Sequence, residues 1–111
     1  MPLSLRRLED GALEVEGDLT REGALELLQR LESLPAAAGG TVTLDLYGLE
    51  VTDGVAAALA VDGIRALLRR GLRVVLRGAP QVLGHVLYRV GLLEEGESLE
   101  LVELRQDEPY G

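Results

Sequence analysis

Hydrophobic and polar residues follow one another along this chain at two spacings, one typical of strands and the other of helices. Short runs of alternating or β-branched hydrophobic residues predict five strands, near residues 3–8, 13–16, 41–46, 72–77 and 98–104. Hydrophobic residues three and four positions apart predict three helices, over residues 21–34, 55–70 and 80–90. The predicted order of elements is therefore ββαβαβαβ.

Residues at the borders of these segments match the preferences of helix and strand ends. Thr20 is a candidate N-cap for the first helix, and Pro80 suits the first turn of the third. Gly71 and Gly91 stand where a helix commonly ends on a residue with positive φ. The pair Gly17-Asp18 is expected to break the second strand.

Strands that alternate with helices need right-handed crossovers, which give a largely parallel sheet with helices packed on it. We therefore expect an α/β fold with a mostly parallel or mixed central sheet of about five strands. A chain of 111 residues is close to the usual size of one domain. A single domain over 1–111 is predicted, with its core over about 3–104 and a polar tail over 105–111.

The composition supports a folded core and excludes several classes of function. Hydrophobic residues make up 47% of the chain and charged residues 27%, which is ordinary for a folded domain. The only aromatic residues are three tyrosines and the formal net charge is -8, so the stacking rings and basic surface of nucleic-acid-binding proteins are missing. The absence of cysteine excludes disulfides and thiol chemistry.

No apolar stretch approaches the roughly 20 residues that a membrane-spanning helix needs, and arginines interrupt the N-terminal segment early. We therefore expect a cytoplasmic protein that does not insert into the membrane.

Few residues offer catalytic chemistry. His85, the only histidine, lies off the hydrophobic stripe of its helix with no partner placed to activate it, so a surface position and a non-enzyme are predicted. Asp45 and Asp53 lie at a strand end and at the head of the next helix, where α/β sheets often bind ligands. Asp53 is expected to cap that helix. No cofactor or metal is predicted, although a ligand site using both aspartates stays open as an alternative.

The stretch over residues 43–59, TLDLYGLEVTDGVAAAL, resembles the signature of STAS domains. In that family a strand ending in Leu-Asp-Leu is followed by a short loop, then by Asp-Ser and the small-residue start of a helix. Three further landmarks align in the same order: Gly17-Asp18-Leu19, Arg70-Gly71-Leu72 and Val90-Gly91-Leu92. The resemblance covers about residues 5–104 and implies a STAS-like fold.

The chain departs from the family pattern at the position that carries regulation. In family members that respond to an anti-sigma-factor kinase, the serine after the aspartate is phosphorylated, and the added charge breaks the complex. Gly54 occupies that position here, so the usual switch cannot operate. Thr52 is the remaining candidate for phosphorylation in this loop, although a loop threonine more often serves a cap or a turn.

The resemblance implies a partner-binding surface around the start of the second helix and along the third. Its predicted residues are Thr52, Asp53, Gly54, Val55, Ala57, Ala58, Gln81 and His85. Replacing Ala57 with arginine is expected to abolish binding and to leave the melting temperature nearly unchanged.

The implied function is a non-catalytic protein-binding module, either a monomer or a weak dimer. The first expected partner is an anti-sigma-factor kinase, which would make the chain an anti-sigma-factor-antagonist-like regulator. The second is the ATPase of an Mla-type phospholipid ABC transporter, for which no phosphorylation is needed. The third alternative is a small-molecule or nucleotide sensor that uses Asp45 and Asp53.

Overall fold

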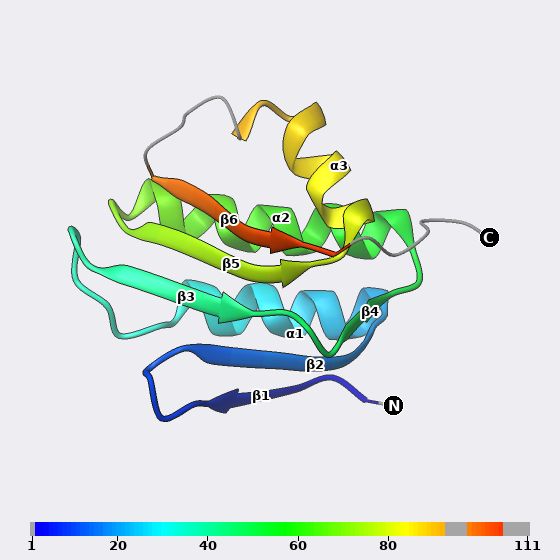
Figure 1. Ribbon diagram of the computed structural model, residues 1–111, viewed down its shortest axis with the longest axis horizontal. Helices are drawn as coiled ribbons and strands as arrows, with labels where there is room; N and C mark the ends of the chain where they lie inside the picture. Colours follow the sequence, from blue (N-terminus) through cyan, green and yellow to red (C-terminus); the bar gives the residue numbers. More distant parts are fainter. Residues whose placement is uncertain (1, 93–97, 106–111) are drawn as a thin grey trace.

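Six strands form one mixed sheet, and α1 and α2 lie side by side behind it while α3 lies near the β6 edge (Figure 1). The computed structural model describes residues 2–92 and 98–105, so residues 106–111 of the predicted polar tail lie outside the described part. The strands are β1 Ser4–Arg7, β2 Leu13–Leu19, β3 Thr41–Asp45, β4 Leu49–Val51, β5 Arg73–Ala79 and β6 Leu99–Leu104. The helices are α1 Arg21–Glu32, α2 Gly54–Arg69 and α3 Gln81–Arg89.

The sheet has the strand order β1-β2-β3-β5-β6, with β4 paired to β2 beyond the end of β3. β1 and β2 are antiparallel, and the other pairs are parallel. The predicted α/β class with a mixed sheet is confirmed, and all eight predicted elements are present. The sheet has one strand more than predicted, because β4 lies in the segment for which the family pattern implies a loop. Three residues are too few to show an alternating pattern.

The second strand is longer than predicted, because Gly17-Asp18 does not end it. β2 pairs with β3 at Leu13 and Glu14, then with β4 from Gly17 onward. Gly17 has a φ of 109°, and a Cβ there would lie 2.4 Å from the carbonyl oxygen of Pro2. The glycine therefore marks the point where the strand changes partner and not its end.

The helix ends agree closely with the sequence. Thr20 accepts a hydrogen bond from the Gly23 amide at 3.1 Å and is the N-cap of α1. Gly71 and Gly91 have the expected positive φ just after α2 and α3. Pro80 is the N-cap of α3 and precedes its first turn by one residue.

Side chains alternate between a buried face of the sheet and a polar one. On the buried face lie Val15, Leu44 and Leu76, each at most 2% exposed. On the other face Arg77 donates to Asp10 at 2.9 Å and to its strand neighbour Asp45 at 3.2 Å. A face covered by ion pairs needs no second layer of helices.

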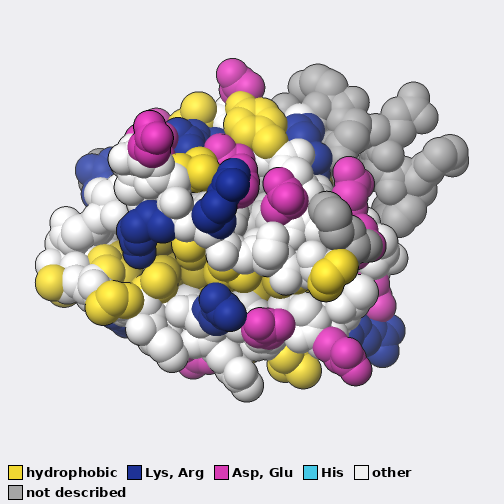
Figure 2. All heavy atoms as spheres, turned by 90° about the horizontal axis from the view of Figure 1, so that it is seen from below, with side chains coloured by type: hydrophobic (Ala, Val, Ile, Leu, Met, Phe, Trp, Pro, Cys, Tyr) yellow, Lys and Arg dark blue, Asp and Glu magenta, His cyan; other side chains and the backbone are white. Residues whose placement is uncertain are grey.

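Within residues 2–92 and 98–105, no aromatic ring is buried in the apolar layer between the helices and the sheet. Leucine, valine, isoleucine and alanine fill it, and a strip of hydrophobic side chains is visible between charged ones from the β1 side (Figure 2). α2 approaches α1 closely at Gly63, where a Cβ would lie 3.0 Å from a methyl carbon of Leu31. Small residues of α2 thus set the spacing of the two helices.

Hydrogen bonds from two arginines hold the loops at either end of the helix layer. Arg70, the C-cap of α2, donates to the carbonyls of Leu34 at 2.6 Å and Ala36 at 2.8 Å, just after α1. Arg105 donates to the carbonyls of Tyr47 at 2.9 Å and Leu49 at 2.5 Å. Arg105 was predicted in the polar tail, but it fixes the loop that joins β3 to β4.

Replacing Arg70 with methionine is expected to lower the free energy of unfolding by about 1–3 kcal/mol, because partly buried carbonyls lose a charged donor. The neighbouring Arg69→Met is the matched control, since Arg69 is exposed, and a change of about 0.5 kcal/mol or less is expected. Urea denaturation followed by circular dichroism measures both. Equal losses in the two variants would contradict the structural role of Arg70.

Candidate functional site

A groove open to solvent lies between the first turn of α2 and the outer side of α3. Its volume is about 420 Å³. The lining residues are Asp53, Gly54 and Val55 from the start of α2, and Val82, His85, Val86 and Arg89 from α3. The groove therefore brings together the two segments in which the sequence placed a partner surface.

Asp53 fixes the start of α2. One carboxylate oxygen accepts a hydrogen bond from the Val55 amide at 2.7 Å, which confirms the predicted N-cap. The other accepts from Nε of Arg21, the first residue of α1, at 2.8 Å. The Val55 amide first, and then Arg21, lower the pKa of Asp53 below its ordinary value. The carboxylate is ionised at neutral pH, and each of its two oxygens accepts a hydrogen bond.

Gly54 is the first residue of α2 and is exposed. A Cβ built at this position would meet no atom within 4 Å. Packing therefore does not require glycine here, and a larger side chain would point into open space at the rim of the groove.

The small-residue start of α2 divides into an outer and an inner side. Val55 is 48% exposed and Ala58 is exposed as well. Ala56 and Ala57 are both 0% exposed. The placement of Ala57 on the partner surface is therefore wrong, because the helical turn carries it into the core. An arginine at Ala57 would disrupt packing and would not be a test of binding.

The α3 side of the groove follows one helical stripe, Val82, His85, Val86 and Arg89. His85 is exposed, as predicted. Gln81 is partly buried and is not among the residues that line the groove. Val82, Val86 and Arg89 line the groove but were not predicted for the site. The i, i+3, i+4, i+7 spacing from Val82 is the sequence signal that would have found them.

The remaining candidates are held by the backbone or by arginines. The Thr52 hydroxyl lies 3.5 Å from the Leu19 carbonyl, a long hydrogen bond. Asp45 accepts from the Tyr47 amide at 3.3 Å and from Arg77, on the polar face of the sheet. Asp45 is not among the residues that line the groove, whereas Asp53 is.

The groove offers little catalytic chemistry. The described residues that line it include no serine, threonine or cysteine that could act as a nucleophile. In the part of the chain that the structure describes, no three histidine or acidic side chains gather in a way that could hold a metal ion. The lining combines the apolar side chains of three valines with the charged or polar groups of Asp53, His85 and Arg89.

The lowered pKa of Asp53 predicts a specific loss of stability in acid. A carboxylate whose pKa is depressed by folding stabilises the folded state above its ordinary pKa of about 3.9, and that contribution disappears as the pH falls through the lower folded value. The stability gap between wild type and Asp53→Asn should therefore narrow below about pH 4. Arg21→Gln should keep the larger part of the pH dependence, because the Val55 amide still donates to Asp53.

Chemical denaturation at a series of pH values measures this effect. A stability gap between wild type and Asp53→Asn that is the same at pH 3 and pH 6 would contradict the role of the ionised cap.

Within residues 2–92 and 98–105, none of the helices is both long and apolar enough to cross a bilayer.

Comparison with known proteins identifies the family of this chain. A search of curated proteins gives no match to the chain. A family model described as "Mlab, STAS domain" matches residues 5–104, which is nearly the whole chain. The landmarks around Asp53 and Gly54 and the observed fold are thereby accounted for together, and the chain belongs to the STAS domain family.

Proposed function

We propose that this chain is a non-catalytic, cytoplasmic protein-interaction module that binds the ATPase of an Mla-type phospholipid ABC transporter through the α2–α3 groove. The observation that carries the proposal is the exposed start of α2, where Gly54 replaces the serine on which kinase-controlled relatives depend. Without a hydroxyl at that position, binding is constitutive. The description of the matching family supports the transporter-type reading.

The chemistry of the groove supports a protein partner. Val55, Val82 and Val86 offer apolar area, and His85 and Arg89 supply hydrogen-bond donors beside it. Asp53 is already neutralised by Arg21, so it contributes a fixed helix start more than a free charge. A preformed surface of this kind loses little conformational entropy on binding.

An anti-sigma-factor kinase is the second candidate partner. The Asp53 cap and the open space around Gly54 preserve the backbone on which the family switch is built. A member with glycine at this position would bind such a kinase permanently, because no phosphate can be added there to release it. The two candidates therefore differ in partner and agree in surface.

Capture of purified partners by the tagged chain tests the proposal. The transporter ATPase is expected to bind, and Val55→Arg should weaken that binding at least tenfold. Leu25→Arg is the matched control, because Leu25 on α1 has the same exposed fraction of 48% as Val55 and lies outside the groove. Isothermal titration calorimetry gives the dissociation constants.

Capture of the kinase in place of the ATPase would move the assignment to the second candidate. Loss of ATPase binding in Leu25→Arg as well as in Val55→Arg would contradict the groove as the binding surface.

A charge at Gly54 separates binding from stability. In Gly54→Glu the new carboxylate lies at a helix N-terminus, where it is expected to raise the free energy of unfolding by about 0.3–1 kcal/mol. The same charge stands at the rim of the groove and should weaken partner binding at least tenfold, as phosphate does in regulated relatives. Thermal unfolding and calorimetric titration of one protein sample measure both effects, and unchanged affinity would place the partner elsewhere.

A further inference from the structure

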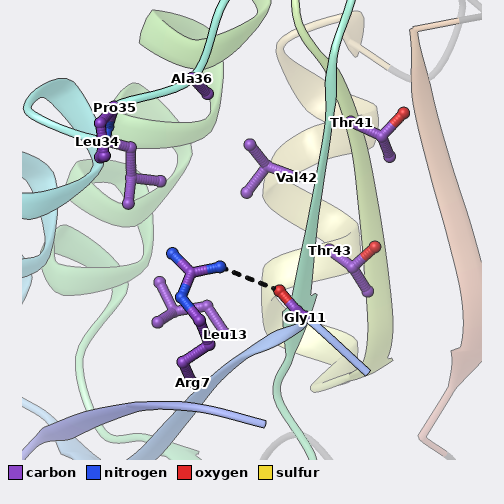
Figure 3. Close-up of a pocket in the computed structure, with 9 residues that line it drawn as sticks. All are labelled: Arg7, Gly11, Leu13, Leu34, Pro35, Ala36, Thr41, Val42 and Thr43. Carbon is purple, nitrogen blue, oxygen red and sulfur yellow. Dashed lines mark hydrogen bonds between the residues drawn. The ribbon is translucent and has the colours of Figure 1, made fainter. Parts of the chain in front are cut away.

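A second, smaller pocket lies beside the first residues of β3 (Figure 3). Its volume is about 110 Å³. Leu13 at the start of β2, Leu34 after α1 and Val42 of β3 direct their side chains into it. These three residues give the pocket an apolar wall.

Arg7, the last residue of β1, supplies the charge of this pocket. Its guanidinium reaches into the cavity and donates one hydrogen bond, to the Gly11 carbonyl at 3.2 Å (Figure 3). No carboxylate of the described residues forms an ion pair with it, although the chain has 19 acidic residues and 11 basic ones. The preceding residue, Arg6, pairs with Glu14 at 2.8 Å. Arg7 therefore keeps donor capacity beside an apolar wall.

The backbone of β3 supplies donors on the other side of the pocket. The Leu46 amide donates to the Arg77 carbonyl, and the Arg73 amide donates to the Gly40 carbonyl. Gly40 and Leu46 flank β3, so the even-numbered residues between them also point their backbone groups toward β5. In a parallel ladder the odd-numbered residues then face β2. β2 pairs with β3 only from Leu44 onward.

The amides of Thr41 and Thr43 consequently point toward the β2 side of β3, before the paired stretch begins at Leu44, and both residues line the pocket. Their side chains point away from the cavity in Figure 3, which leaves the backbone as the part of these residues that lines it.

We propose that this pocket binds a carboxylate carried on a short aliphatic group. The guanidinium of Arg7 and the amide of Thr43 hold the carboxylate oxygens, and the aliphatic part lies against Leu13, Leu34 and Val42. A volume of about 110 Å³ holds roughly four groups of the size of a water molecule, which limits the ligand to a short chain. A free short-chain acid and the C-terminus of a peptide ending in a small apolar residue share this chemistry.

Sodium butyrate is the probe, and methyl NMR of the leucine and valine side chains is the measurement. Butyrate is expected to shift the methyl signals of Leu13, Leu34 and Val42 saturably, whereas n-butanol, which lacks the charge, should not. Arg7→Gln should weaken butyrate binding at least tenfold. Arg6→Gln is the matched control, because Arg6 is the adjacent strand residue and is paired with Glu14. It should bind butyrate as wild type does.

Two further ligands identify the source of the carboxylate. A short peptide ending in valine is compared with butyrate and with its own C-terminal amide. Tighter binding of the peptide than of butyrate assigns the site to a peptide terminus. Weaker binding of the peptide than of butyrate assigns it to a free short-chain acid. The proposal is overturned if butyrate causes no saturable shift, if n-butanol acts equally, or if Arg7→Gln binds butyrate unchanged in a protein whose spectrum remains folded.

Discussion

α1 and α2 can lie against each other on one face of the sheet because α2 offers glycine and alanine where the two helices meet. At Gly63 even a single added carbon would touch Leu31 closely, so the distance between the helix axes is set at this point. Among the residues that the structure describes, no aromatic side chain is buried in the core to fill a wider gap. Small and branched aliphatic side chains reach close packing only where the surrounding elements lie near one another. The close approach of α1 and α2 at Gly63 meets this requirement.

The position of the groove follows from this packing. Asp53 accepts hydrogen bonds both from its own helix, α2, and from Arg21 of α1. The start of α2, which lines the groove, is therefore positioned relative to α1. That ion pair is exposed and contributes little energy by itself. The apolar contact between α1 and α2 holds Arg21 and Asp53 at this distance. Arg105, which follows β6, fixes the loop between β3 and β4.

Much of this arrangement could be predicted from the sequence, because periodicity and capping residues act locally. Thr20, Asp53 and Gly71 have the roles that their neighbours indicated. The failures concern residues whose role depends on distant segments. Gly17 looked like a strand end because its partner β4 lies some thirty residues away, and Ala57 looked like surface because all neighbouring residues are equally small. The prediction of the α3 side of the groove was incomplete for the same reason, since α3 meets α2 only in the folded chain.

The open space around Gly54 has a consequence for how such a domain changes over evolutionary time. Glycine and serine codons can differ by one base, and nothing in the surrounding structure selects between the two residues. If the groove binds its partner as proposed, one such mutation adds or removes a phosphorylatable hydroxyl at position 54 and leaves the surrounding architecture intact. In that proposal a single substitution converts a permanent binder into a reversible one, and the fold does not have to change with it.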